Sequence, residues 1–428
     1  MKSYAAIAAY FGVRVLSALV LLKLSAQFLS VGGFADFAQF LAFSSLLNMA
    51  VVGGAQNGLI RQAAAASDEE LDAVQGAGLA ILLAAVPLLG IPISLFSTAI
   101  SRILTGSPDQ WRTVIGLGLL ALAAAPGQIC WSLLSGRRRV AHSLGLQAFG
   151  ILAGTGATSW FIVRGNVSLG ALAFATGPVL ASLATLPFLS QLKLSWRPTS
   201  LGLKHLLGYS GAIASTLGFS ALILFALRWT YREHFGSVEL GYWLAANRIS
   251  DLSTQFLGLF LLQAFVPQFT AATDPFERRL LIFRYGALGA GLTGSALLIF
   301  VSAGRLLVHL FLSDAYLPAI PSIRLYMLGD FARLWVSLAM FAAFALGKPG
   351  RYAWIEISTV ALMALVTLVL IRTNEVLAPQ IAYASAFGVM ALLIGATIFL
   401  RSHPRPRAEL RVHGARQIPL RDSVLRLP

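Results

Sequence analysis

Two opposite charges lie in the middle of an apolar stretch that is long enough to cross a membrane. The stretch covers residues 236–268 and contains Arg248 and Asp251, with the amides Asn247 and Gln255 close by. Arg248, Asp251 and Gln255 share one face of a helix, because they are spaced by three and four residues. Charged side chains at membrane depth are costly and usually face a water-filled cavity or a partner. Two interpretations follow: a neutral Arg248–Asp251 pair, or a cavity where Arg248 faces a polar cargo while Asp251 orients it or carries a proton.

Polar side chains also interrupt the other apolar stretches and are candidates for lining the same cavity. They are Arg14, Lys23, Asn48, Gln56, Asn57, Asp330 and Arg333. Arg14 is central in its stretch with no acid beside it, so we expect either an anion site or a pairing with another helix. The others also have structural interpretations. Lys23 is near enough to a helix end to reach the interface, amides often join membrane helices, and Asp330 and Arg333 are spaced to pair.

The charges at membrane depth are mainly positive. The cations are Arg14, Lys23, Arg248, Arg324 and Arg333, and the acids are Asp251, Asp330 and Glu356. Arginine suits phosphate, because its planar guanidinium binds two oxygens at once. An exporter of cationic drugs is expected to show the reverse balance, with acids lining its cavity. The residues therefore favour an anionic cargo.

The sequence shows no motif for catalysis or for a cofactor. It contains no HExxH, no GxSxG in a strand–turn–helix context, no GxxxxGK[ST] phosphate loop and no DxD-type metal pair in a loop. The single cysteine, Cys130, and six scattered histidines give neither a disulfide framework nor a metal-ligand spacing. We therefore expect no enzyme, no metal, no cofactor and no transport driven by ATP bound to this chain.

The composition indicates the class of protein. Of the 428 residues, 57% are hydrophobic and 11% are charged, whereas about a quarter of the residues in a soluble domain are charged. Apolar runs of about 20 residues predict membrane helices, and the alternating segments of about ten residues typical of membrane barrels are missing. The expected fold class is an all-α polytopic membrane protein. Its net charge of +15 then reports orientation rather than nucleic-acid binding.

The apolar runs and the breaks between them predict about twelve membrane-spanning helices. Their ranges are 4–28, 36–60, 75–99, 113–135, 143–163, 167–190, 208–229, 238–266, 279–302, 322–346, 352–372 and 377–400. An even number of helices puts both termini on one side of the membrane. Lysine and arginine accumulate in the loops on that side, so both termini are expected in the cytoplasm.

The second half of the sequence repeats features of the first. GGFADFAQFLA at 32–42 matches FGSVELGYWLA at 235–245, and acidic helix starts follow at 67–70 and 274–277. This repetition predicts two parallel six-helix repeats, related by an axis along the membrane normal. The expected domains are an N-terminal six-helix bundle at 1–190, a cytoplasmic connector at 191–207, a C-terminal six-helix bundle at 208–400 and a basic, disordered cytoplasmic tail at 401–428. The tail is either simply solvated or bound to anionic lipid headgroups.

Three segments carry a family resemblance: 32–66, which begins GGFADFAQFLA, 239–269, which begins ELGYWLAANRISD, and 328–348, which begins LGDFARLW. They resemble the Wzx-type polysaccharide flippases of the MOP superfamily, which also holds MATE exporters and lipid II flippases. The likeness extends over about residues 1–400. It implies two six-helix bundles around a central cavity, lined largely by helices one, two, seven and eight. The residues it would place near that cavity are Arg14, Asn48, Gln56, Asn57, Arg248 and Asp251. The helix-one acid typical of proton-coupled MATE exporters is missing, and Arg14 stands in that region.

The resemblance implies a flippase in the bacterial cytoplasmic (inner) membrane. Its cargo would be an undecaprenyl-pyrophosphate-linked oligosaccharide, an O-antigen or exopolysaccharide repeat unit, moved from the cytoplasmic to the outer leaflet by alternating access. The expected partners are membrane lipids and a polysaccharide polymerase or chain-length protein, without nucleic acid. The main alternative is a MATE-like exporter of drugs or other small molecules. A membrane polymerase or ligase is a further one, although no external loop is long enough for a catalytic domain.

Overall fold

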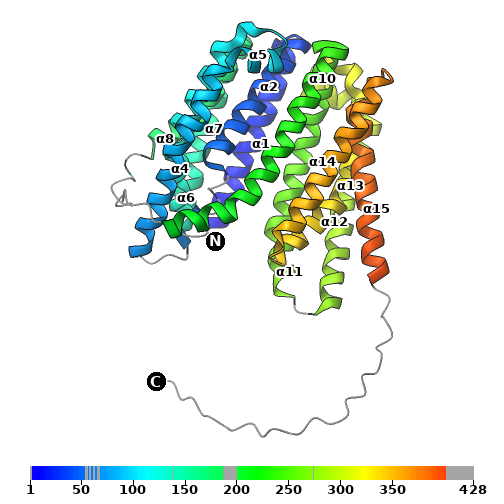
Figure 1. Ribbon diagram of the computed structural model, residues 1–428. Coiled ribbons are helices and arrows are strands. Elements are labelled where there is room, and N and C mark those ends of the chain that lie inside the picture. Colours follow the sequence, from blue (N-terminus) through cyan, green and yellow to red (C-terminus); the bar gives the residue numbers. More distant parts are fainter. Residues whose placement is uncertain are drawn as a thin grey trace, which may run out of the picture.

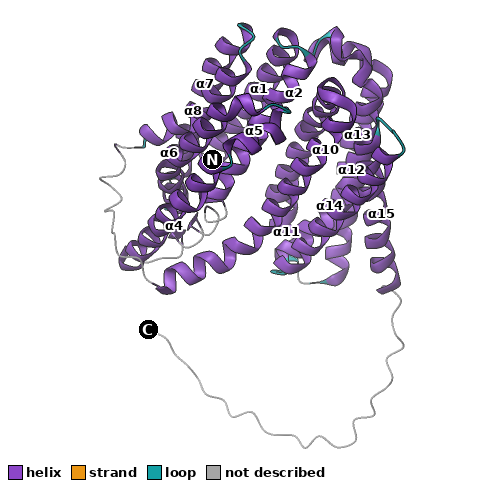
Figure 2. Cartoon of the chain, turned by 45° about the horizontal axis from the view of Figure 1, so that its top comes forward, coloured by secondary structure: helices purple, strands orange, loops and turns teal. Residues whose placement is uncertain are grey.

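The protein is a helical bundle over every residue whose placement is described. The computed structural model describes residues 2–53, 68–137, 139–185, 200–272 and 274–401, together with 56, 59, 60, 63, 64 and 187. All regular secondary structure in these residues is helical (Figure 2). The predicted all-α fold class is therefore confirmed. Asn57, residues 191–199 of the predicted connector and the predicted tail beyond residue 401 lie outside the described residues.

The first half of the described chain consists of long helices joined by short turns. They are α1 (Lys2–Phe28), α2 (Val31–Asn48), the π-helical turn η1 (Met49–Gly53), α4 (Asp68–Leu95), α5 (Ser97–Thr105), the 3-10 turn η2 (Pro108–Gln110), α6 (Trp111–Gly136), α7 (Val140–Val163) and α8 (Val167–Leu183). Helix α2 begins five residues before the predicted start at 36, because Ser30 caps it. The Ser30 hydroxyl accepts a hydrogen bond from the Gly33 N–H at 3.1 Å.

The second half contains one very long helix and four further long ones. The elements are α10 (Ser200–Phe260), the π-helical turn η4 (Leu261–Phe265), α11 (Val266–Ala271), α12 (Pro275–Phe311), the 3-10 turn η5 (Asp314–Ala319), α13 (Ile320–Ala345), α14 (Pro349–Arg372) and α15 (Ala378–Arg401). Helix α10 is interrupted at Gly236, whose φ of 87° and ψ of 174° are not helical. Glycine adopts a positive φ without strain, so α10 consists of two helices that meet at this residue.

In the part of the chain that the structure describes, the number of long helices agrees with the prediction of about twelve. Within the described residues, nine helices are long and apolar enough to span a membrane. The shorter apolar helix α8 and the two parts of α10 are the remaining long helices, which makes twelve.

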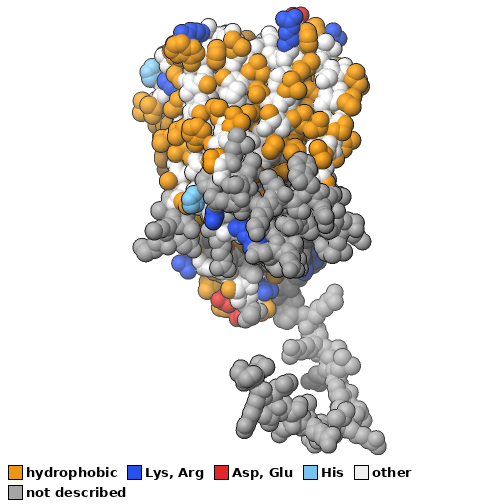
Figure 3. Space-filling view, turned by 90° about the vertical axis from the view of Figure 1, so that its left-hand side faces the viewer, with side chains coloured by type: hydrophobic (Ala, Val, Ile, Leu, Met, Phe, Trp, Pro, Cys, Tyr) orange, Lys and Arg blue, Asp and Glu red, His pale blue; other side chains and the backbone are white. Residues whose placement is uncertain are grey.

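The helices of each half lie together. In Figure 1 α1 to α8 form one side of the molecule and α12 to α15 the other, and α10 runs between them, packed against α2, α13 and α14. The start of α1 and the end of α15 lie at the same end. Outside the residues drawn in grey, hydrophobic side chains cover most of the face in Figure 3, and most lysine and arginine side chains lie toward its two ends. This distribution fits a surface that faces lipid.

Hydrogen bonds and an ion pair join the two halves at the end of the molecule where α1 ends and α2 begins. The Lys23 ammonium donates to the carbonyls of His309 and Leu312, both at 2.8 Å, in the last turn and cap of α12. These carbonyls lack helical partners, and a cation there is favoured by the helix dipole. Arg232 of α10 forms an ion pair with Asp36 of α2 at 2.5 Å. We call this region the joined end.

Helices α6 and α8 touch through a glycine, which gives a test of the packing. The Gly127 N–H donates to the Ser182 hydroxyl at 2.8 Å, and a Cβ at Gly127 would overlap the Ser182 backbone. We expect Gly127→Ala to lower the free energy of unfolding by about 2 kcal/mol through overpacking. Gly156→Ala on α7 is the control, because nothing lies within 4 Å of its added Cβ. Thermal unfolding in detergent measures both variants, and equal midpoints would contradict the close contact.

Candidate functional site

A cavity lies between the two halves, among α1, α2, α8 and the second part of α10. Its volume is about 130 Å³, and most of its wall is apolar. The polar side chains that line it are those of Ser25, Arg248, Asp251 and Gln255. The residues that the sequence placed on one helix face thus line a single cavity, which we call the central cavity.

Arg248 and Asp251 line the central cavity without pairing with each other. In the described part of the chain no ion pair within 4.0 Å joins them. The Arg248 guanidinium lies 3.5 Å from the Ala38 carbonyl, at the limit of a hydrogen bond. Asp251 accepts a hydrogen bond from the Asn247 amide at 3.3 Å. In this conformation Arg248 is therefore an arginine without an acidic partner on the wall of a cavity.

A second arginine, Arg228, lies behind the same wall and was not among the predicted residues. Its guanidinium donates to the Asn247 side-chain oxygen at 3.2 Å and to the Gln39 side-chain oxygen at 3.4 Å. Its Nε–H is buried without a partner. Asn247 therefore connects Arg228 to Asp251. Its side-chain oxygen accepts a hydrogen bond from Arg228, and its side-chain nitrogen donates one to Asp251. The cluster holds the Arg228 and Arg248 charges against the single carboxylate of Asp251.

The predicted residues of the first half are not gathered at the central cavity. Arg14 is exposed on α1, and Lys23 lies at the joined end, where it caps α12. Asn48 accepts a hydrogen bond from Gln128 of α6 at 2.8 Å, so it joins two helices. Gln56 is half-buried beyond η1. None of these four side chains lines the described cavity.

Asp330 and Arg333 lie inside the second half and not on the cavity wall. Asp330 is 2% exposed and accepts hydrogen bonds from Ser250, Ser253 and Tyr383, at 2.8, 2.9 and 2.7 Å. Arg333 donates to the same Tyr383 hydroxyl at 3.1 Å. The predicted acid–arginine pair is thus linked through a tyrosine, in a polar cluster among α10, α13 and α15. Ser250 directly precedes Asp251, so of these two neighbouring residues of α10 one belongs to the polar cluster and the other lines the central cavity.

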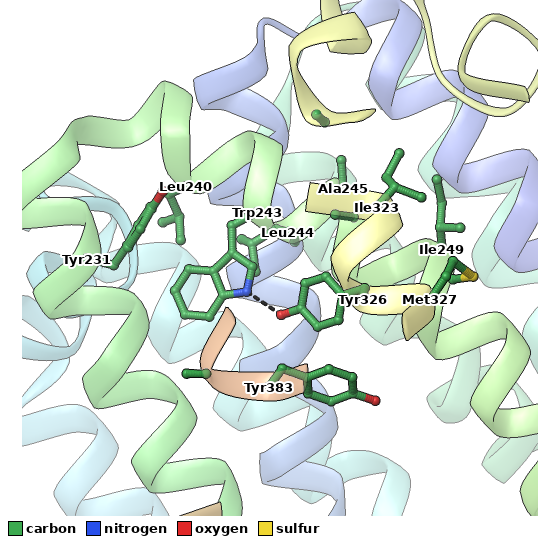
Figure 4. Packing of buried hydrophobic residues seen from close by; sticks show 14 of the residues in the cluster. Tyr231, Leu240, Trp243, Leu244, Ala245, Ile249, Ile323, Tyr326, Met327 and Tyr383 are labelled. Atoms are coloured by element: carbon green, nitrogen blue, oxygen red, sulfur yellow. Dashed lines mark hydrogen bonds between the residues drawn. The ribbon is translucent and has the colours of Figure 1, made fainter. Parts of the chain in front are cut away.

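Aromatic packing fixes the second part of α10 on the helices behind it. The Trp243 indole donates to the Tyr326 hydroxyl of α13 at 2.6 Å, and the Tyr326 ring lies 4.8 Å from that of Tyr383 on α15 (Figure 4). Trp243 and Tyr231 pack edge to face at 5.0 Å across the break in α10. Because Arg248 is five residues after Trp243, this packing fixes the backbone that presents Arg248 to the cavity.

The fold is that of the transporters of the MOP superfamily. An inward-facing multidrug resistance MATE family transporter of this superfamily has a TM-score of 0.73, with 14% identity over 91% of this chain and 93% of its own. The lipid II flippase MurJ in an inward closed conformation has a TM-score of 0.71, with 13% identity over 92% of this chain and 87% of its own. An outward-facing MATE family transporter has a TM-score of 0.60, with 13% identity over 93% of this chain and 95% of its own.

These likenesses establish the fold alone, because the identities are low. No protein-family model and no curated protein matches the sequence. The predicted MOP-type fold is confirmed, and the three similar structures are those of two MATE family transporters and a lipid II flippase.

Proposed function

We propose that the protein is a flippase for undecaprenyl-pyrophosphate-linked oligosaccharide, an O-antigen or exopolysaccharide repeat unit. The observation that carries this proposal is Arg248, which has no acidic partner on the wall of the central cavity. Arg228 lies behind it, and among the described residues only Asp251 opposes the two charges. A diphosphate brings negative charge and oxygen acceptors, and arginine binds such groups well at low dielectric. The membrane-facing exterior of the bundle lets the lipid tail stay in the bilayer while the polar head crosses through the cavity.

The transport step is alternating access by the two bundles, residues 1–190 and 208–400. The higher TM-score with the inward-facing than with the outward-facing MATE transporter supports a chain that is closed toward the outside in this conformation. In that arrangement the joined end is the outer end, and both termini lie in the cytoplasm. Opening of the joined end then exposes the central cavity to the outer leaflet.

The proposed location is the bacterial cytoplasmic membrane, where such lipids are made on the inner leaflet. The lipid-linked oligosaccharide and the surrounding membrane lipids are the proposed partners, and the flippase named among the related structures supports a lipid cargo. An interaction with a polysaccharide polymerase or chain-length protein stays a prediction.

The test is the sidedness of lipid-linked oligosaccharide in cells that lack this gene. We expect the glycan to accumulate on the cytoplasmic leaflet and the unchanged chain to restore its accessibility to an external probe. Arg248→Ala is expected to restore flipping about tenfold less well, because a hydrogen bond to a charged group contributes about 1.5 kcal/mol or more. Arg164→Ala is the control, since Arg164 is exposed at the end of α7 and stacks on Trp160. Normal outward delivery in the deleted cells, without a second flippase, would refute the proposal.

An exporter of small molecules is the second candidate function, favoured by the likeness to MATE transporters. It predicts that overproduction raises drug resistance and that efflux follows a cation gradient. The excess of arginine at the central cavity argues against a cationic drug as cargo. Drug efflux that survives Arg248→Ala, with unchanged sidedness of the glycan lipid, would select this candidate instead.

A further inference from the structure

A second cavity lies wholly within the first half, among α1, α6, α7 and α8. Its volume is about 190 Å³, larger than the 130 Å³ of the central cavity. Tyr10, Trp131, Gln147 and Phe174 supply its larger side chains, and glycines of α7 supply part of its wall. None of the residues that line it carries a charge. We call it the N-half cavity.

The polar groups of the N-half cavity are incompletely satisfied. Trp131 is 7% exposed, and its indole N–H has no hydrogen-bond partner. A buried donor without a partner is costly and rare. Gln147 accepts from the Tyr10 hydroxyl only at 3.4 Å and donates one N–H to Ser143 at 3.2 Å. Its second N–H is left for another acceptor. The cavity thus combines aromatic surface with neutral donors.

The N-half cavity adjoins the central cavity. Phe174 of α8 lines both of them, so the neutral cavity and the one that carries Arg248 share the side chain of this residue as part of their walls. A cationic site and a neutral aromatic site therefore lie next to each other. A sugar joined to a diphosphate has a matching arrangement: an anionic group that suits the cationic site lies next to a ring whose hydroxyls and C–H faces suit the neutral aromatic site.

We propose that the N-half cavity binds the first pyranose ring of the cargo, while Arg248 binds the diphosphate; this rests on the proposed flippase function. The faces of Trp131 and Tyr10 pack on the C–H groups of the ring, because aromatic faces attract partly positive hydrogens. The Trp131 indole N–H and the free N–H of Gln147 donate to ring hydroxyls. Few, well-placed polar groups on an aromatic wall are typical of small-ligand sites. The site thereby selects glycosylated over bare lipid diphosphate.

Two probes separate this proposal from the function on which it rests. Purified protein in lipid nanodiscs is titrated with a polyprenyl pyrophosphate and with the same lipid carrying one N-acetylhexosamine. The unchanged chain should bind the glycosylated probe more tightly. Trp131→Phe keeps an aromatic ring and removes the N–H. This variant and Gln147→Leu should each lower the affinity for the glycosylated probe about fivefold and leave the affinity for the bare diphosphate unchanged. Trp160→Phe, an exposed tryptophan of α7, is the matched control.

The outcomes are distinct for the two hypotheses. Equal affinity of the unchanged chain for the two probes overturns the sugar site, and so do unchanged affinities in both folded variants. Arg248→Ala should weaken both probes. If neither probe depends on Arg248, the proposed function fails independently of the sugar site. Thermal unfolding of each variant reports whether it is folded, and Gln147→Leu keeps the test decisive if Trp131→Phe does not fold.

Discussion

A chain that carries both Arg228→Gln and Arg248→Gln is expected to flip lipid-linked oligosaccharide at least about a hundredfold more slowly than the unchanged chain. Glutamine keeps a polar side chain at each position, so the change removes charge more than volume. The unchanged cluster has two guanidinium groups against the carboxylate of Asp251, which leaves a net positive site. The double variant leaves Asp251 alone, and the site then repels a diphosphate at low dielectric.

The sign of the effect is tested by a third substitution. Adding Asp251→Asn to the double variant removes the remaining like charge and should recover part of the lost flipping. The control is Arg164→Gln with Arg372→Gln, which makes the same change in net charge at two exposed helix ends. External labelling of the glycan measures all three chains. If the double variant kept more than a tenth of normal flipping, the arginine pair would not be the diphosphate site.

The sequence was sufficient to place most helices, because each apolar run ends at a residue that breaks a helix or seeks water. The predicted range 113–135 became α6 from Trp111 to Gly136, and 352–372 became α14 from Pro349 to Arg372. The start of α2, which lies at the joined end, was predicted at residue 36. The helix begins earlier because Ser30 supplies its cap. The boundaries of the two bundles stay predictions.

Arg228 was missed for a related reason. The apolar run ends at Trp229, so the predicted helix ended there, and Arg228 at its end was not among the candidate residues. The helix in fact continues to the break at Gly236, because Tyr231 and Arg232 are buried against other helices. The available signal was the four-residue spacing of Arg228 and Arg232, which puts both on one face of a continuous helix.

The faces of the other polar residues could not be assigned from the sequence. A membrane helix is apolar on its lipid side and its packed side, so hydrophobic periodicity does not show which side faces the interior. Lys23, Asn48 and Asp330 were equally consistent with a cavity and with helix packing. In the structure Lys23 donates to backbone carbonyls at the end of α12 and Asn48 accepts a hydrogen bond from Gln128. Asp330 accepts hydrogen bonds from a cluster of hydroxyl groups. Whether cargo reaches any of them in another conformation stays a prediction.

The second large effect is expected at the joined end, where Asp36→Ala should open the contact between the halves. The Arg232 side chain is 8% exposed and that of Asp36 is 28% exposed. Removing one partner of a fully buried pair costs about 3–5 kcal/mol, and an exposed pair contributes about 0–1 kcal/mol. We expect about 2 kcal/mol for this half-buried pair, which raises the ratio of open to joined molecules about thirtyfold.

Distances between spin labels measure this shift. Cys130 is the single cysteine, so Cys130→Ala gives a background for Gln27→Cys and Leu317→Cys, two exposed positions in opposite halves near the joined end. Asp36→Ala should move population to a longer distance. Glu233→Ala, which removes an exposed acid beside Arg232, is the control and should not. Combining Asp36→Leu with Arg232→Met removes both charges and should restore the shorter distance, because no buried charge is then left unpaired. An Asp36→Ala distribution identical to that of the background chain would show that the ion pair does not hold the halves together.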